Sequence, residues 1–216
     1  MSVTAVIYCA GCGSRLQAGV PKGMVQVCGQ TILSRMIRRV RSITEDIVVV
    51  SGFCSALVEQ HCKNLGVRCI ENKIWEDGIH TTTQTAASIV NHKNSVLRID
   101  GDVVLFQNIP PTTKNTIFVR STGPTDHYQS VSVVDGLLHI HSGTMYPLWS
   151  KLELYEPGWF HGVATLHRNG PYFKALNALG LRATLRELPG IDINNTKDLK
   201  SAEKQIGALN ANHGTV

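Results

Sequence analysis

Two patterns of apolar and polar residues alternate along the first half of the chain. Residues 2–9 form a short apolar run that ends in glycines, which is typical of a buried strand. Residues 31–43 carry apolar side chains at every third or fourth position, which is typical of a helix that buries one face. Repeated along the chain, the two patterns predict strands at 2–9, 46–50, 67–71 and 95–99, and helices at 31–43, 55–65 and 81–91.

The order of these segments predicts the fold class. Short links join strand to helix, and parallel strands need such helical crossovers, so we expect an α/β fold with a Rossmann-like, doubly wound, mostly parallel sheet. The second half is predicted to hold strands at 116–120 and 183–188, a hairpin at 131–140 that turns at Asp135-Gly136, and helices at 146–154, 171–179 and from Asn195 onward. We expect a single domain over residues 1–216, with a small β-rich insert at about 115–165.

The composition narrows the classes of partner. A chain of 216 residues with 43% hydrophobic content can bury a full core. Its net charge of +5 suits a protein that handles phosphates, but the basic residues are dispersed, so we expect no nucleic-acid partner. No apolar run approaches the roughly 20 residues that cross a bilayer, and no signal-peptide pattern opens the chain, so we expect a cytoplasmic protein with no membrane partner.

A glycine-rich turn follows the first strand and carries the strongest functional signal. Gly11-Cys12-Gly13-Ser14-Arg15-Leu16 stands directly after the strand, and Pro21-Lys22 follows. Glycines there let backbone N–H groups approach a phosphate, and two basic side chains can neutralise a triphosphate. The spacing matches neither a Walker A loop nor a dinucleotide fingerprint. It predicts a nucleotide-binding loop of Ala10, Gly11, Gly13, Ser14, Arg15 and Lys22, with Arg15 and Lys22 in catalytic roles.

Six cysteines raise the question of redox or metal chemistry. Cys9 and Cys12 form a C-x-x-C pair, which occurs in redox sites and in zinc sites. A structural zinc needs four ligands, and the sequence offers no second pair at the required spacing. Cys9 also ends an apolar strand, where cysteine packs as a small hydrophobic residue. We therefore expect reduced thiols.

The glycine-rich turn and its flanks also carry a family resemblance. The run C-A-G-C-G-S-R-L, followed by P-K-G-M-V-Q-V-C-G-Q-T-I-L, resembles the signature of the GT-A-like (MobA/IspD-like) nucleotidyltransferases, especially the phosphocholine, inositol-phosphate and phosphonate cytidylyltransferases. The resemblance implies Mg²⁺-dependent transfer of CMP from CTP to a small phosphorylated or phosphonylated acceptor, with release of pyrophosphate. The β-rich insert would then form the acceptor side. The family usually has Ala and a variable residue at Cys9 and Cys12, which explains the C-x-x-C pair.

Two further stretches resemble the metal-binding segments of that family. LRIDGDVVLF matches a strand whose aspartate binds Mg²⁺, which implies a metal ligand at Asp102 and a role for Asp100 in orienting it or contacting the nucleotide ribose. GIDINNTKDL matches the late segment that supplies the second ligand, and both Asp192 and Asn194 fit that position. Asp192 is favoured because a neutral Asn194 is a weaker Mg²⁺ ligand, and Asn194 stays the alternative.

One stretch between these segments resembles the part of the family that recognises the base. NKIWEDGIHTTTQTAAS implies that Thr82 and Thr83 bind the nucleotide, although threonines at a helix start also serve as caps. Four other functions stay open: a molybdenum-cofactor-type enzyme, suggested by W-E-D-G-I, a sugar-phosphate nucleotidyltransferase that uses another NTP, a glycosyltransferase that retains a nucleotide-sugar, and a non-catalytic nucleotide-binding regulatory protein. The acceptor and the oligomeric state, including a homodimer, are also left open.

Overall fold

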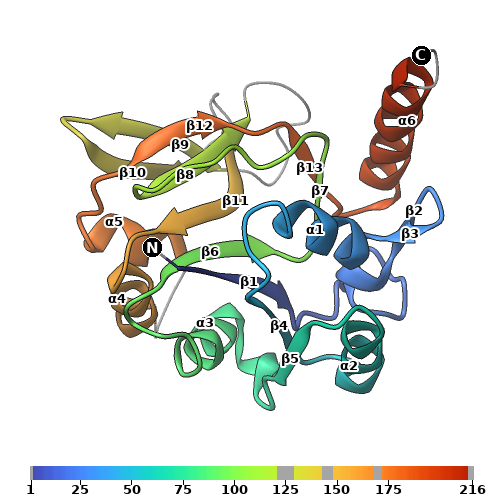
Figure 1. Cartoon of the computed structure of the whole chain (residues 1–216), viewed down its shortest axis with the longest axis horizontal. Helices are drawn as coiled ribbons and strands as arrows, with labels where there is room; N and C mark the ends of the chain where they lie inside the picture. Colours follow the sequence, from blue (N-terminus) through green and yellow to red (C-terminus); the bar gives the residue numbers. More distant parts are fainter. Residues whose placement is uncertain (1, 121–128, 143–147, 168–171, 214–216) are drawn as a thin grey trace.

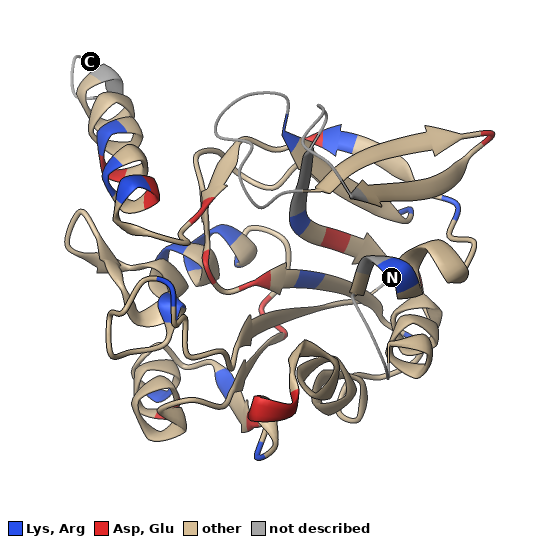
Figure 2. Cartoon of the chain, turned by 180° about the vertical axis from the view of Figure 1, so that it is seen from behind, with Lys and Arg blue, Asp and Glu red and all other residues tan. Residues whose placement is uncertain are grey.

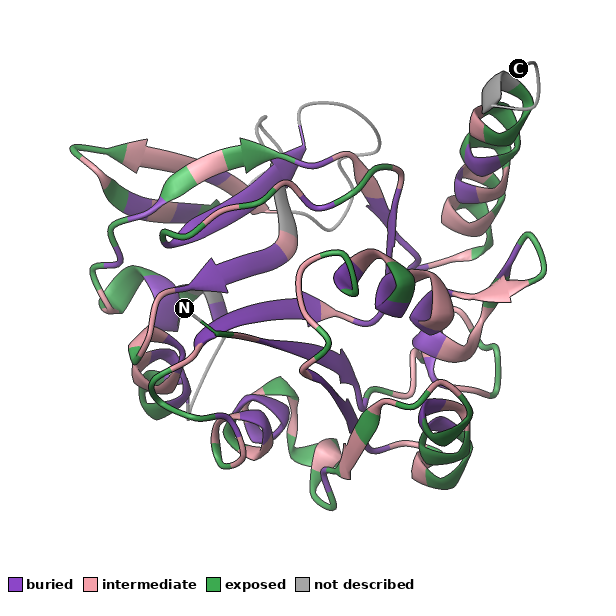
Figure 3. Cartoon of the chain, in the orientation of Figure 1, coloured by how far each residue is buried: buried purple, intermediate pink, exposed green. Residues whose placement is uncertain are grey.

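Parallel strands form the centre of the molecule. The computed structural model describes residues 2–120, 129–142, 148–167 and 172–213. In it, β5 (Arg68–Glu71), β4 (Ile47–Ser51), β1 (Val3–Cys9) and β6 (Ser95–Asp100) lie side by side in this order and run parallel (Figure 1). The apolar runs of β1, β4 and β6 are buried, as expected for parallel strands covered on both faces, and the edge strand β5 is only partly buried (Figure 3).

Helices cover both faces of these strands. Along β1, Ala5 and Ile7 belong to the core cluster that holds α1 (Ile32–Val40) and α2 (Ser55–Asn64). Their neighbours Val6 and Tyr8 belong to the opposite cluster, which the remaining packing helices cover: α3 (Ile79–Ala87), α4 (Trp159–Leu166) and α5 (Tyr172–Ala178). The alternation arises because successive side chains of a strand point to opposite faces. The predicted Rossmann-like, doubly wound fold is thus confirmed, and α3 starts two residues earlier than predicted.

The β-rich insert continues this sheet. β11 (Leu148–Tyr155) pairs antiparallel with β6, and β9 (Gln129–Val134) and β10 (Leu137–Ser142) extend the sheet beyond it. β8 (Thr116–Arg120) also pairs with β11, and β12 (Thr184–Glu187) pairs with β8. The predicted hairpin is present, with positive φ angles at Asp135 and Gly136 as a tight turn requires. The insert is therefore joined to the central strands by hydrogen bonds.

The helix predicted over residues 146–154 is wrong, because the described part of this segment is strand β11. The register of β11 against β8 shifts between Trp149 and Glu153, and Lys151 has a φ of +51°. A β-bulge of this kind interrupts the two-residue alternation of a strand, and the apolar spacing then imitates a helix. The helix of this region, α4, lies further along the chain and was not predicted.

A small two-stranded sheet connects the end of β6 to the C-terminal part of the chain. β7 (Val103–Leu105) pairs antiparallel with β13 (Gly190–Asp192), so that Asp192 lies opposite Val103. The predicted last helix is present as α6 (Thr196–His213), which projects from the body in Figure 1. The side chain of Asn195 caps α6 by accepting hydrogen bonds from two backbone N–H groups of its first turn. The pairing of β7 with β13 brings two predicted metal-binding segments together.

Shorter elements complete the chain. β2 (Gln26–Val27) and β3 (Gln30–Thr31) form a small hairpin, and 3₁₀ turns span Lys22–Met24 and Trp75–Asp77. Figure 2 shows basic residues spread over several elements rather than gathered on one. Within the described residues, every helix is too short or too polar to cross a bilayer.

Candidate active site

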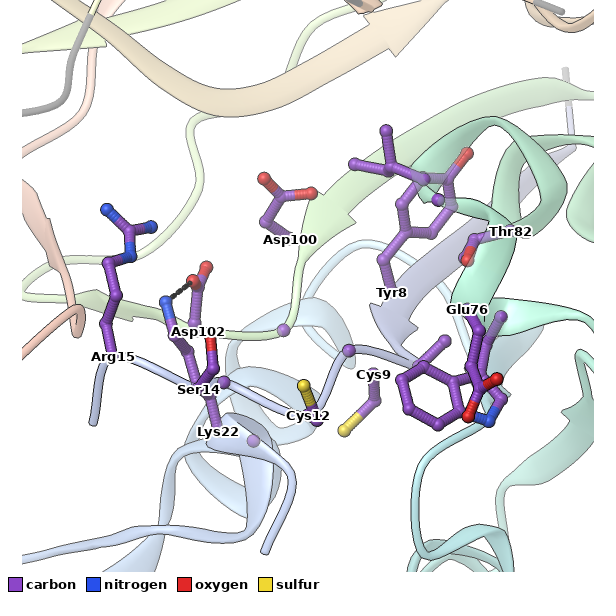
Figure 4. Close-up of a pocket in the computed structure, with 18 residues that line it drawn as sticks. Tyr8, Cys9, Cys12, Ser14, Arg15, Lys22, Glu76, Thr82, Asp100 and Asp102 are labelled. Carbon is purple, nitrogen blue, oxygen red and sulfur yellow. Dashed lines mark hydrogen bonds and ion pairs between the residues drawn. The ribbon is translucent and has the colours of Figure 1, made fainter. Parts of the chain in front are cut away.

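A cavity of about 390 Å³ opens where β1 and β6 end. Ligands of such α/β sheets bind outside the carboxyl ends of the strands, so this is the expected place for a substrate. Figure 4 shows basic side chains at one end of the cavity and Thr82 at the other. Its lining includes these residues predicted from the sequence: Ala10, Gly11, Gly13, Ser14, Arg15, Lys22, Thr82, Asp100 and Asp102.

The glycine-rich loop forms one wall of the cavity. Gly13 has a φ of +61°, a conformation that favours glycine, and its carbonyl accepts a hydrogen bond from the backbone of Leu16 at 2.9 Å. A Cβ at Gly13 would lie 2.6 Å from Cγ of Lys22. The glycine therefore permits both the turn and the close packing of the Lys22 side chain. Gly11 has no heavy atom within 4 Å of an added Cβ, which leaves the loop backbone open on that side.

Lys22 joins three parts of the chain. Its ammonium lies 2.7 Å from a carboxylate oxygen of Asp102 and 2.8 Å from the side-chain oxygen of Asn194 (Figure 4 draws the contact with Asp102). Arg15 donates to the same Asn194 oxygen at 2.9 Å. The backbone N–H of Ile193 donates to the carbonyl of Asp102 at 2.9 Å, which fixes the two segments together. The structure thus brings the phosphate loop and both predicted metal-binding segments to one point.

Asp102 and Asn194 have the arrangement of a cation site. Two oxygens, one from each residue, lie within 2.8 Å of one ammonium nitrogen, so a cation already occupies the position between them. The second oxygen of Asp102 is buried and has no hydrogen-bond partner among the described residues. Burial alone would raise the pKa of Asp102, but the charges of Lys151 and Lys22 outweigh it and hold this pKa below its usual value.

This pair fits Mg²⁺ in one specific way. Mg²⁺ in proteins is usually held by one or two carboxylates together with water and substrate phosphates. Within the described ranges, no group of three His, Cys, Asp or Glu side chains could hold a metal ion. Asp102 and Asn194 would therefore need phosphate oxygens from a nucleotide to complete the coordination.

Asp192, the ligand favoured from the sequence, has a different partner. Its carboxylate is 2% exposed and forms an ion pair with the ammonium of Lys151 at 2.9 Å. Burial raises the pKa of Asp192 to about 6. Burial alone would lower the pKa of Lys151, but Asp192, Asp102 and Asp100 together hold it above its usual value. Lys151 was not identified from the sequence, because it lies in the segment predicted as a helix.

Asp100 forms an ion pair with the buried Arg98. Arg98 pairs with Asp100 and, at 3.2 Å, with Glu153, and its guanidinium lies 4.7 Å and 4.5 Å from the ring centres of Tyr8 and Tyr172. Burial raises the pKa of Asp100, although Arg98 opposes this effect. Asp100 is thus held firmly at the cavity wall, and the sequence had no signal for the role of Arg98.

The two predicted base-binding threonines differ in position. Thr82 lines the cavity, and its oxygen accepts a hydrogen bond from the buried Asn72 at 3.1 Å. Thr83 is fully buried, donates to the carbonyl of Ile79 at 3.1 Å and lies 3.2 Å from Nδ1 of His167. Thr83 is therefore not among the residues that line the cavity, and its contact with a nucleotide stays a prediction.

Several residues of the cavity wall were not predicted as site residues. Trp75 and Glu76 both line the cavity, Glu76 lies near Thr82 in Figure 4, and Trp75 packs edge-on against Phe53 with ring centres 5.7 Å apart. Both belong to the W-E-D-G-I stretch, which was noted only for its family resemblance. Cys9 and Cys12 also line the cavity, and all six cysteines are free thiols, as expected.

Comparison with known proteins agrees with this geometry. The model of the MobA-like NTP transferase domain matches residues 5–112, which is half of the chain and contains the glycine-rich loop, Asp100 and Asp102. A bifunctional IPC transferase and DIPP synthase of Rubrobacter xylanophilus is 35% identical over 103 residues, covering 45% of this chain and 24% of the relative. The bifunctional protein GlmU of Syntrophomonas wolfei is 32% identical over 108 residues, covering 50% of this chain and 24% of the relative. The chain thus spans about a quarter of the length of these relatives.

A solved structure extends the similarity of the fold to the second half of the chain. The CTP:phosphocholine cytidylyltransferase of Streptococcus pneumoniae superposes with a TM-score of 0.80 and covers 95% of this chain and 100% of its own. Its sequence identity is 18%, so this comparison concerns the fold alone. The β-rich insert is therefore part of a fold that a known cytidylyltransferase shares.

Proposed function

The chain belongs to the MobA-like NTP transferase family, and on this premise we propose that it transfers CMP from CTP to a small phosphorylated or phosphonylated acceptor and releases pyrophosphate. The observation that carries the proposal is the meeting of Lys22, Asp102, Asn194 and Arg15 at one end of the cavity. The choice of CTP is supported by the cytidylyltransferase whose fold the chain shares. The acceptor class comes from the family resemblance of the motifs.

The cavity has a phosphate end and a base end. The phosphate end holds the exposed loop and the basic side chains of Arg15 and Lys22, whose charges suit a triphosphate (Figure 4). The base end holds Thr82, whose oxygen accepts from Asn72 and whose hydroxyl hydrogen can be donated to a carbonyl of a pyrimidine. A nucleoside triphosphate in this orientation would place its α-phosphorus beside Asp100 and Asp102.

The reaction needs charge neutralisation more than proton transfer. An oxygen of the acceptor's phosphate or phosphonate attacks the α-phosphorus, a new P–O bond forms, and the bond from the α-phosphorus to the bridging oxygen breaks, so that pyrophosphate leaves with the electron pair. The acceptor oxygen is already an anion, so no general base is required. Lys22 would move away from Asp102 and Asn194, and its ammonium would then neutralise the developing charge on the α-phosphate. Arg15 would hold the leaving phosphates.

We further propose that Mg²⁺ is the cofactor and that Asp102 and Asn194 hold it. When bound there, Mg²⁺ would neutralise the phosphate oxygens that these two residues face. Asp192, favoured from the sequence, is the alternative ligand, but its ion pair with Lys151 argues for Asn194. Removal of the divalent cation by EDTA is expected to abolish turnover, and restored Mg²⁺ to recover it.

A second candidate is a nucleotidyltransferase that uses another nucleotide. The family description names NTPs in general and no particular base. The single hydroxyl of Thr82 can donate to a carbonyl of uracil or thymine just as it can to that of cytosine, so it does not distinguish these bases. A sugar-phosphate or molybdenum-cofactor-type substrate therefore stays an alternative to a CTP-dependent reaction, as does a regulatory protein that binds a nucleotide without turnover.

The test is release of pyrophosphate from the purified chain with Mg²⁺ and each of the four NTPs. A mixed pool of phospho-alcohols, sugar phosphates and phosphonates serves as acceptor, and products are identified by mass spectrometry. A CMP-linked product supports the proposal and identifies the acceptor. A product linked to another nucleotide favours the second candidate, and nucleotide binding with no product from any NTP contradicts a transferase. Samples without an acceptor and samples with EDTA are the controls.

A further inference from the structure

A second lysine lies among the carboxylates of the site without lining the cavity. The side chain of Lys151 is 19% exposed, and its ammonium lies 2.9 Å from the carboxylate of Asp192, whose side chain is 2% exposed. Lys22, by contrast, lines the cavity. The side chain of Lys22 is 13% exposed, so the two lysines are buried to a similar extent, and they differ in that Lys22 lines the cavity and Lys151 does not.

The backbone of β11 is shaped to bring Lys151 to this place. Leu152 pairs with Ile99 of β6, and the backbone carbonyl of Lys151 accepts a hydrogen bond from Arg98 at 3.3 Å, so Lys151 lies close to the end of β6. The register of β11 against β8 shifts between Trp149 and Glu153, and Lys151, within this bulge, has a φ of +51°, a left-handed conformation that is unfavourable for a residue with a side chain. Bulges of this kind re-aim a side chain and are frequent next to active sites. Here the ammonium of Lys151 is directed toward Asp192.

The charges of the site are paired in a definite way. Arg98 is shared by Asp100 and Glu153, and Lys22 is shared by Asp102 and the neutral Asn194. Lys151 is the partner of Asp192. Lys22 lines the cavity and can exchange its partners for phosphate oxygens, whereas Lys151 is held by the carboxylate of Asp192, which is 2% exposed.

We propose that Lys151 is a positioning residue that keeps the Asp192 carboxylate away from the divalent cation. The cation then binds at Asp102 and Asn194, chiefly when a nucleotide draws Lys22 away from these two residues. The proposal rests on the proposed function for the role of the cation and the nucleotide. It has a consequence for the free protein: without a nucleotide, Lys22 and Lys151 together keep the affinity for divalent cations low. An Asp192 carboxylate released from Lys151 would raise that affinity, because a carboxylate is a strong ligand for a hard cation.

The test is a titration of the nucleotide-free protein with Mn²⁺, followed by the electron paramagnetic resonance signal of free Mn²⁺. We expect Lys151→Met to bind Mn²⁺ at least about tenfold more tightly than the wild type, which corresponds to about 1.4 kcal/mol. Lys151→Arg, which keeps the charge, should stay within about threefold of the wild type. Lys93→Met, which removes an exposed lysine outside the site, is the matched control and should change nothing.

The double variant K151M/D192N separates the two possible roles of Asp192. It removes both charges of the ion pair together, so it should fold even if K151M does not, and the proposal expects its Mn²⁺ affinity within about threefold of the wild type. Unchanged affinity in K151M, or a double variant that binds more than about tenfold more weakly than the wild type, would overturn the proposal. The second result would mean that Asp192 is itself a metal ligand.

A crystallographic measurement tests the same proposal without a variant. In crystals grown with CTP and Mn²⁺, the anomalous signal of Mn²⁺ should lie at Asp102 and Asn194, with the pair of Lys151 and Asp192 intact. A signal that contacts Asp192, with Lys151 displaced, would contradict the proposal. The Mn²⁺ titration contains neither nucleotide nor acceptor, so its result does not depend on whether CMP transfer is found, and a failure of the proposed function is detected separately by the absence of product.

Discussion

The cations of the site differ between the two halves of the chain. In the first half, Arg15 and Lys22 come from the glycine-rich loop and line the cavity, and both donate to Asn194. In the second half, Lys151 comes from a bulge of β11, pairs with the buried Asp192 and is not among the residues that line the cavity. Under the proposals made above, the loop cations exchange partners with a substrate, and the cation of β11 holds a carboxylate in position.

The first half of the chain also contains both kinds of cation, those that line the cavity and one that does not. Arg98 lies only a few residues before Asp102, but it is 1% exposed, lies near two aromatic rings and pairs with two carboxylates. Burial therefore separates Arg98, which supports the site, from the loop cations that line the cavity. Variants of the two groups should fail in different ways: the buried group in folding, the cavity-lining group in turnover.

The largest effect is expected for Arg98→Met. This change leaves Asp100 and Glu153 near each other without their counter-charge, and breaking a buried ion pair typically costs about 3–5 kcal/mol. We expect the free energy of unfolding, measured by urea denaturation and circular dichroism, to fall by about that amount. Arg68→Met is the matched control, because Arg68 forms an exposed ion pair with Asp46 and its loss should cost less than about 1 kcal/mol. Equal losses in the two variants would contradict the supporting role of Arg98.

Lys22→Ala should show the opposite behaviour. Loss of one electrostatic stabiliser of a transition state lowers turnover by at least about a hundredfold, so we expect this reduction in the rate of pyrophosphate release. Because Lys22 lies at the cavity surface, the urea midpoint should change far less than in the Arg98 variant. Lys93→Ala, at an exposed position outside the site, is the control and should keep the wild-type rate. A Lys22 variant with a normal rate would exclude the catalytic role proposed here.

The first half of the fold could be predicted because each of its strand–helix units is encoded locally. The glycine-rich loop is also one contiguous segment, so its order after the first strand was enough to predict that Arg15 and Lys22 lie at one site, and both line the cavity. The bulge at Lys151 had no such signal, since it interrupts the alternation by which a strand is recognised. Arg98 was missed for a related reason: a charged residue inside an apolar strand reveals its partners only when the neighbouring strand is known.

The choice between Asp192 and Asn194 shows a further limit of the sequence. Both residues fit the family segment, and a carboxylate is the better ligand, which favoured Asp192. The structure pairs Asp192 with a lysine from β11 and places Asn194 within 2.8 Å of Lys22, and neither contact could be inferred from the spacing of the segment. The roles of such neighbours depend on side chains from distant strands.

The smallest effect is expected for the adjacent threonines of α3, Thr82 and Thr83, whose variants are compared by their CTP binding and their stability. Thr82→Val removes a hydroxyl from the cavity wall while keeping the shape of the side chain, and the loss of one neutral hydrogen bond costs about 0.5–1.5 kcal/mol. We expect the Kd for CTP, measured by isothermal titration calorimetry, to rise by about threefold to tenfold, with little change in stability.

Thr83→Val is the control for this measurement and should give the reverse result. Its hydroxyl is buried against His167, so its removal should lower the free energy of unfolding by about 1–3 kcal/mol and leave the Kd for CTP near the wild-type value. Weaker CTP binding in Thr83→Val with unchanged binding in Thr82→Val would exchange the two roles and restore the sequence-based prediction for Thr83. The expected result would instead show that a single position along α3 separates a residue that meets the nucleotide from one that supports the wall.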